Sequence, residues 1–425
     1  MHARTKDGVS PSASVGSHPA RWMVFRAFLT QNVSIGSAYG AFGVTVLPLQ
    51  EQFGASRGAA ALGLALCVLT TGLSGPLIGA MITRIGLRWT MMLGAILSCT
   101  GYALLAVAPD MVTVLLLYAL PIGLGTAMLG SFPSSVLASN WNAQNPGPAL
   151  GITNMPLLLA LLPMVGLALI QDYGLGSFYL TLAALHLLLL PVIHGVSDGP
   201  EVIGKPAPDP HGHVAYKMPA VRAVLGSPAF WAMTIGAGYL SAAGITGVSH
   251  LVAFAIERGI AASPAALLLS IMGGAAILGS LLSGMLCGRI GASRTLVVMS
   301  CGLCASWIIL LSTTAYPPMA AAALLIGMSG AGVYPAVNML ASRLFGQHSL
   351  PRILGIYGLA TLPLTFSLPP LAGVLHDAAG GYGPVAWFII GGTALVAILF
   401  LTMRRGAPLG RAVEDAARPE LSCAN

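Results

Sequence analysis

The sequence predicts an all-α polytopic membrane protein with twelve transmembrane helices in two homologous six-helix bundles. Its 425 residues are 56% hydrophobic and only 7% charged, whereas soluble domains carry about 25% charged residues. Apolar runs of about 18 or more residues recur along the chain, and each is long enough to cross a hydrocarbon core as a helix. A basic turn at 79–88 returns about 205 residues later, at 284–294, which indicates two related halves.

The repeat extends beyond this turn. Leu150-Gly151-Ile152 returns as Leu354-Gly355-Ile356. Six spans in each half give both halves the same orientation, an arrangement in which the binding site lies between the halves near the midplane. The matched positions of the turn are Gly79 with Gly284, Arg84 with Arg289, and Gly86 with Gly291.

Charges, glycines and prolines divide the chain into spans in the following order. The first bundle, 22–196, contains spans 22–49, 59–83, 89–108, 111–139, 149–170 and 178–196. A polar, proline-containing linker occupies 197–227. The second bundle, 228–403, contains spans 228–256, 264–288, 295–314, 318–343, 353–375 and 384–403. Polar tails of 1–21 and 404–425 flank the two bundles.

The basic residues predict the orientation of these spans. Of the 19 Lys and Arg residues, all except Arg57 and Arg258 fall on one side of the membrane. Basic residues accumulate in cytoplasmic loops, so both termini and the linker are expected in the cytoplasm. This topology also accounts for the net charge of +7 without nucleic-acid binding.

The turn resembles the loop between helices two and three of the major facilitator superfamily. That pattern is Gly, three residues, Asp, a basic residue, any residue, Gly, any residue and further basic residues, and here it is carried by Gly79, Thr83, Arg84, Gly86 and Arg88. The resemblance implies two bundles that rock around a cavity lined mainly by helices one, four, seven and ten. Thr83 stands where the family has its acid, and Gly288 does so in the echo. We therefore expect a weaker cytoplasmic latch in which Arg84 finds its partner elsewhere.

Other stretches are similar to the monocarboxylate and oxalate/formate branch of this superfamily. They are Tyr39-Gly-Ala-Phe-Gly-Val, Leu47 to Arg57, and Phe345-Gly346 followed by Gly355-Ile-Tyr-Gly358. That branch often carries a charged residue in helix eight or eleven, whereas spans 264–288 and 353–375 contain none. The resemblance implies an organic acid as solute, and this departure weakens the case for selecting an anion.

All twelve acidic residues lie outside the predicted spans, which leaves His186 and His250 as candidate proton carriers within them. Tyr239, Thr246 and His250 share one stripe of span seven, at helical spacing. Asn32 and Tyr39 form a similar stripe on span one. These residues are predicted to face one cavity, with His250 as a proton or carboxylate contact. The alternative is a neutral His250 that bonds a neighbouring helix, and for His186 packing is favoured.

Three further residues have two interpretations each. Tyr334 and Asn338, one turn apart on span ten, are candidate substrate contacts, although such groups more often bond neighbouring helices. Arg26 lies inside span one, where it either attracts an anion or extends its side chain to the headgroups.

The predicted function is a secondary transporter, not an enzyme, that moves a monocarboxylate or related organic acid inward with protons by alternating access. We expect a monomer in a bacterial inner membrane, with a small solute, protons and lipid as its partners. No cofactor, metal site or nucleic-acid partner is expected, because no phosphate-binding loop or metal-ligand cluster is apparent. The alternatives are a proton-coupled exporter of hydrophobic or neutral compounds and a receptor that binds a solute without transporting it.

Overall fold

A computed structural model of the chain describes residues 18–55, 57–199 and 220–403, and within these ranges the regular structure is helical. Nine helices in the described part are long and apolar enough to cross a membrane. The prediction of an all-α, multi-pass membrane fold is therefore confirmed. The count of twelve helices and the cytoplasmic placement of the termini remain predictions.

Irregularities interrupt the helices of the first half. Gly86 (φ 86°) breaks α4, and Gly174 (φ 83°) breaks α9, each in a left-handed conformation that glycine adopts without steric cost. Pro121 lies in the π-turn η2. The elements are α1 His18–Ile35, η1 Gly36–Gly40, α2 Phe42–Phe53, α3 Arg57–Leu73, α4 Gly75–Leu105, α5 Met111–Leu117, η2 Tyr118–Ile122, α6 Gly123–Leu129, α7 Ser131–Trp141, α8 Pro146–Thr153 and α9 Leu157–His194.

The second half has longer uninterrupted helices, and each of its six predicted spans falls on one of them. A short helix, α11 (Val221–Leu225), lies within the predicted linker. The six long helices are α12 Pro228–Glu257, α13 Ala262–Arg289, α14 Ala292–Ser312, α15 Tyr316–Phe345, α16 Leu350–Ala379 and α17 Gly383–Thr402, with a single 3₁₀ turn, η3 (Gln347–Ser349), before α16.

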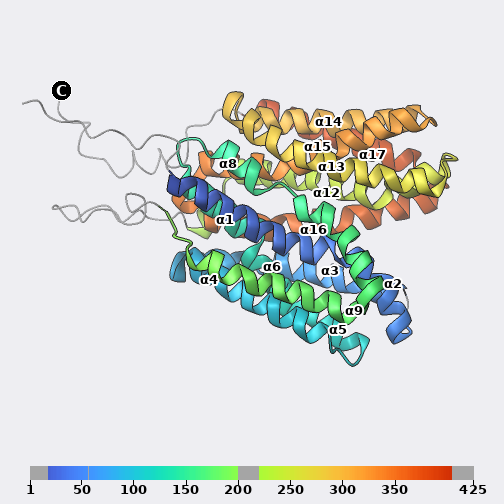
Figure 1. Ribbon diagram of the computed structural model, residues 1–425. Coiled ribbons are helices and arrows are strands. Elements are labelled where there is room, and N and C mark those ends of the chain that lie inside the picture. The colour runs from blue at the N-terminus through green and yellow to red at the C-terminus, as the bar shows by residue number, and fades with distance from the viewer. Residues whose placement is uncertain (1–17, 56, 200–219, 404–425) are drawn as a thin grey trace, which may run out of the picture.

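Figure 1 shows most helices of the first half, blue to green, below those of the second half, yellow to red. Helix α8 departs from this division and lies beside α13 of the second half. Residues 1–17, 200–219 and 404–425, which hold most of the predicted tails and linker, lie outside the described residues.

Candidate functional site

A cavity of about 280 Å³ lies between the two halves. Its lining comes from α1, η1, α3, α4, α6 and α7 of the first half and from α12, α15 and α16 of the second. This volume is at the small end for ligand pockets, as expected for a small solute. Much of the lining carries hydroxyl groups, from Tyr39, Thr71, Thr126, Ser131, Ser241, Tyr334, Tyr357, Thr361 and Thr365.

Three of the lining threonines use their hydroxyl hydrogen within the protein. Thr71 Oγ1 donates to the Cys67 carbonyl at 2.8 Å. Thr361 Oγ1 donates to the Tyr357 carbonyl at 2.9 Å, and Thr365 Oγ1 to the Thr361 carbonyl at 3.2 Å. A hydroxyl has one hydrogen and two lone pairs. These threonines therefore present acceptor lone pairs to the cavity.

Other lining hydroxyls retain a hydrogen to donate. Ser131 Oγ accepts from Gln31 Nε2 at 3.3 Å, and its own hydrogen has no acceptor among the described residues. The phenols of Tyr39 and Tyr357 do not donate to a backbone carbonyl in the described ranges, and each has a polar side chain beside it, Thr71 and Ser241 respectively. The cavity thus offers both donors and acceptors.

Two of the seven predicted substrate contacts line this cavity. Tyr39 belongs to the π-turn η1, in which Ala41 N–H bonds the Gly36 carbonyl at 2.8 Å. Such turns are frequent at functional sites. Tyr334 lines the cavity from α15, whereas Asn338, one turn further, is fully buried and donates through Nδ2 to the Tyr334 carbonyl at 2.9 Å.

Asn32 is not among the cavity residues. Its amide group instead joins α1 to the break between α8 and α9. Helix α8 ends at Thr153 and α9 begins at Leu157, after Pro156. Asn32 Nδ2 donates to the Met155 carbonyl, and Asn32 Oδ1 accepts from Leu158 N–H, both at 3.0 Å. The break leaves the Leu158 N–H without a helical partner, and Asn32 supplies one. The Met155 carbonyl also accepts from the Leu157 N–H at 3.0 Å.

The predicted stripe on α12 contacts other helices of the second half, and none of its three residues lines this cavity. Tyr239 Oη donates to the Phe388 carbonyl of α17 at 2.9 Å. Thr246 is fully buried and bonds its own helix at the Ala242 carbonyl. The α12 residue that lines the cavity is Ser241, on another face.

Both ring nitrogens of His250 have partners outside the cavity. Nε2 lies 3.0 Å from the Pro369 carbonyl of α16, and Nδ1 lies 3.1 Å from Tyr382 Oη. Two turns beyond, Glu257 of α12 pairs with His376 of α16 at 3.0 Å. These contacts hold the end of α12 against α16. The role of His250 in proton coupling stays a prediction.

Two residues considered for other roles also bond backbone carbonyls. Arg26 Nη1 donates to the carbonyl of Gly195, which follows the last residue of α9, where the helix dipole favours a cation. His186 is buried and its Nδ1 bonds the Leu182 carbonyl at 2.8 Å, in agreement with packing. A role for Arg26 in attracting anions stays a prediction.

The turn of the first half is held by Asp198, which the sequence analysis did not single out. Leu87 N–H donates to Asp198 Oδ1 at 2.9 Å, directly after the break at Gly86. Arg88 Nε donates to the Val196 carbonyl at 2.7 Å. A carboxylate therefore does lie at this turn, contributed by the segment after α9 instead of position 83. Arg84 is exposed. That its side chain finds a partner elsewhere stays a prediction.

At the end of the molecule that holds both turns, here called the motif side, the two halves pack backbone against backbone. Gly79 of α4 faces the Pro351 carbonyl of α16, and Gly284 of α13 faces the Gly147 carbonyl of α8. A Cβ at either glycine would overlap the facing oxygen. Nearby, Ser280 Oγ donates to the Gly151 carbonyl at 2.9 Å.

The turn of the second half has a backbone like that of the first-half turn. Gly291 (φ 90°) precedes α14 as Gly86 precedes the second part of α4. Arg289 ends α13, where its charge suits the helix C-terminus.

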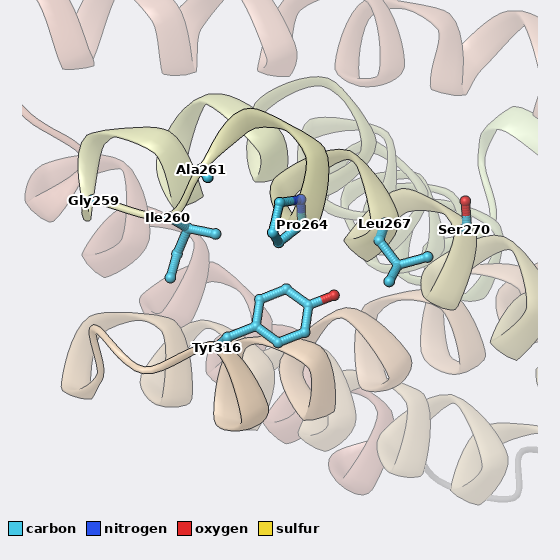
Figure 2. A pocket seen from close by; sticks show the side chains of 7 residues that line it. All are labelled: Gly259, Ile260, Ala261, Pro264, Leu267, Ser270 and Tyr316. Carbon is cyan, nitrogen blue, oxygen red and sulfur yellow. The ribbon is translucent and has the colours of Figure 1, made fainter.

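A second, larger cavity of about 760 Å³ lies at the opposite end of the second half. Figure 2 shows Tyr316 below the α12–α13 loop, with Pro264 and Leu267 beside it. Its lining comes from the second half alone. This cavity therefore does not lie between the two bundles, where a repeat transporter binds its solute.

Comparisons with known proteins agree with this architecture. A family model described as Major Facilitator Superfamily matches residues 27–362 and also 251–422. Human monocarboxylate transporter 6 is 25% identical over 401 residues, covering 86% of this chain and 76% of that protein. Human monocarboxylate transporter 11 is 26% identical over 419 residues, covering 91% and 83%. Mouse monocarboxylate transporter 14 is 27% identical over 151 residues, and the match covers 29% of its length.

Two solved structures share the fold. The human organic anion transporter MFSD10 (TETRAN) has a TM-score of 0.71 and 17% identity, with 90% of this chain and 99% of that chain covered. The proton:xylose symporter XylE has a TM-score of 0.70 and 14% identity, with 92% and 96% covered.

Proposed function

The chain belongs to the Major Facilitator Superfamily, and we propose from this premise that it carries a monocarboxylate or related small organic acid across the membrane together with a proton. The observation that carries the proposal is the small hydroxyl-lined cavity between two duplicated halves. The similarity to monocarboxylate transporters over most of the chain supports the solute class.

The glycine contacts support alternating access as the mechanism. Backbone packs on backbone at Gly79–Pro351 and Gly284–Gly147, and no side chain has to withdraw before the halves separate there. Small residues allow helices this close an approach. We propose that this arrangement is the state closed on the motif side, and that rocking of the halves opens it.

We propose that the motif side faces the cytoplasm of a bacterium, as the basic residues predict, and that transport runs inward under an inward proton gradient. A monomer suffices for this mechanism, because the cavity is lined by both halves of one chain.

An exporter of neutral compounds is the second candidate, since the polar groups that line the cavity are hydroxyls. A thermal-shift screen of the purified protein separates the two, because a ligand that binds the native state raises its apparent stability. Stabilisation by small aliphatic acids is expected. Stabilisation by large neutral compounds alone would favour export.

A further inference from the structure

We propose that the solute occupies the central cavity as an undissociated carboxylic acid, so that the transported proton travels on the solute itself. This inference rests on the proposed function, because it concerns the form in which an organic acid is bound.

Three threonines of the cavity have committed their hydroxyl hydrogens to the protein. Thr71, Thr361 and Thr365 donate theirs to backbone carbonyls and offer the ligand lone pairs alone. A carboxylate is also acceptor-only, whereas a protonated carboxyl group has one hydrogen to donate. Lone pairs facing a carboxylate repel it, so this part of the cavity favours the protonated form.

The lining also holds donors for the remaining carbonyl oxygen of the carboxyl group. Ser131 accepts from Gln31, and its own hydroxyl hydrogen has no acceptor among the described residues. The Tyr357 phenol lines the cavity from the second half. An undissociated carboxyl group needs at least one donor and one acceptor from the protein, and this lining offers both kinds of group.

The described residues that line the cavity include no charged side chain. The titratable side chains that line the cavity are the phenols of Tyr39, Tyr334 and Tyr357, which are neutral between pH 5 and pH 8. His250 is directed to Pro369 and Tyr382, on another face of α12 from Ser241. A buried carboxylate needs a paired charge. At pH 7, an acid whose pKa is about 4 is protonated in about one molecule per thousand. The free-energy cost of protonating the acid is smaller than the cost of burying its anion without a cation beside it.

The experiment compares a monocarboxylic acid with its amide, an uncharged analogue of similar size. Binding of each to the detergent-purified full chain is measured by calorimetry from pH 5.5 to pH 8. We expect the affinity for the acid to fall about tenfold per pH unit, since only its protonated fraction binds, and the affinity for the amide to stay constant. A constant affinity for the acid would show that the anion binds, and a parallel fall for acid and amide would place the proton on a side chain. Either result overturns the inference.

Failure of the proposed function gives a different result. In that case the acid does not bind at any pH in this range, including pH 5.5, where its protonated fraction is largest. Binding of the amide alone would have the same meaning.

A pair of variants tests the geometry. Thr361→Val keeps the side-chain volume but removes the hydroxyl lone pairs from the cavity. We expect the acid and the amide both to bind about tenfold more weakly, because each loses one hydrogen bond to the protein. Thr393→Val is the matched control. Thr393 is buried and donates to the carbonyl four residues back, at 2.8 Å, but it is not a cavity residue. Equal affinities in the two variants would overturn the assignment of Thr361.

Discussion

Gly284 of α13 packs directly on the backbone of Gly147 in α8, and the related residue Gly79 of α4 packs in the same way on Pro351 of α16. Both pairs join the two halves on the motif side, and the sequence repeat relates one pair to the other. The repeated turn therefore lies at the contact that the proposed rocking of the halves would break.

A methyl group at position 284 should hold this contact open. In Gly284→Ala the added carbon overlaps the Gly147 carbonyl oxygen. We expect solute uptake to fall at least about tenfold, because more than about 1.4 kcal/mol is lost from the closed state. Gly273→Ala, in the same helix, is the control, since its Cβ meets open space.

Cysteine labelling measures the same effect directly. With Ser241→Cys as the cavity probe in a background without the native cysteines, an impermeant maleimide on the motif side should react faster in Gly284→Ala than in Gly273→Ala. Equal labelling rates would show that Gly284 does not control closure.

Asn32 should contribute to the free energy of unfolding through its bonds to the backbone between α8 and α9. Asn32→Ala leaves the Leu158 N–H without its partner, whereas the Met155 carbonyl loses one donor and keeps the Leu157 N–H. An unsatisfied buried group costs about 1–3 kcal/mol, so we expect a loss of about 2 kcal/mol in thermal unfolding of the purified protein. Asn142→Ala, which removes one bond within a helix, should cost less. Equal losses would contradict this role for Asn32.

Asp198 should stabilise the turn that contains Gly86. Asp198→Ala removes the acceptor of Leu87 N–H, and we expect a loss of about 1 kcal/mol, as for a helix N-cap. Thr83→Ala is the control, because Thr83 is exposed and bonds only the Ala80 carbonyl. Unfolding curves that rank the two variants in the opposite order would refute the assignment.

Replacing His250 distinguishes a structural role of this residue from a role in proton coupling. His250→Ala removes the ring between Pro369 and Tyr382, so thermal stability should fall. If the proton travels on the solute, uptake per folded molecule should keep its dependence on the pH gradient. Loss of that dependence, with counterflow exchange intact, would instead assign the proton to His250.

Much of the fold follows from the chain itself. Apolar length and the nearly constant repeat offset predicted two related bundles and the second-half helices to within a few residues, and the family suggested by the 79–88 turn is confirmed. The breaks at Gly86 and Gly174 lie between predicted spans, because glycine there takes a left-handed conformation.

The face that each helix presents was harder to predict. Helical spacing grouped Tyr239, Thr246 and His250 on one stripe, but spacing does not say whether the cavity or α17 lies opposite it. Asn32 bonds the backbone on either side of Pro156, more than a hundred residues away. Asp198 bonds the backbone directly after Gly86, over a similar separation. Such pairings depend on how distant segments pack, which local patterns do not contain.

The most direct test of the account is accumulation of a radiolabelled aliphatic monocarboxylic acid in proteoliposomes under an inward proton gradient, with protein-free liposomes subtracted to remove passive diffusion. The account predicts saturable accumulation above the external concentration, which collapses when the gradient is dissipated and is reduced at least about tenfold in Gly284→Ala but not in Gly273→Ala. Saturable binding without accumulation in any of these proteins would contradict it.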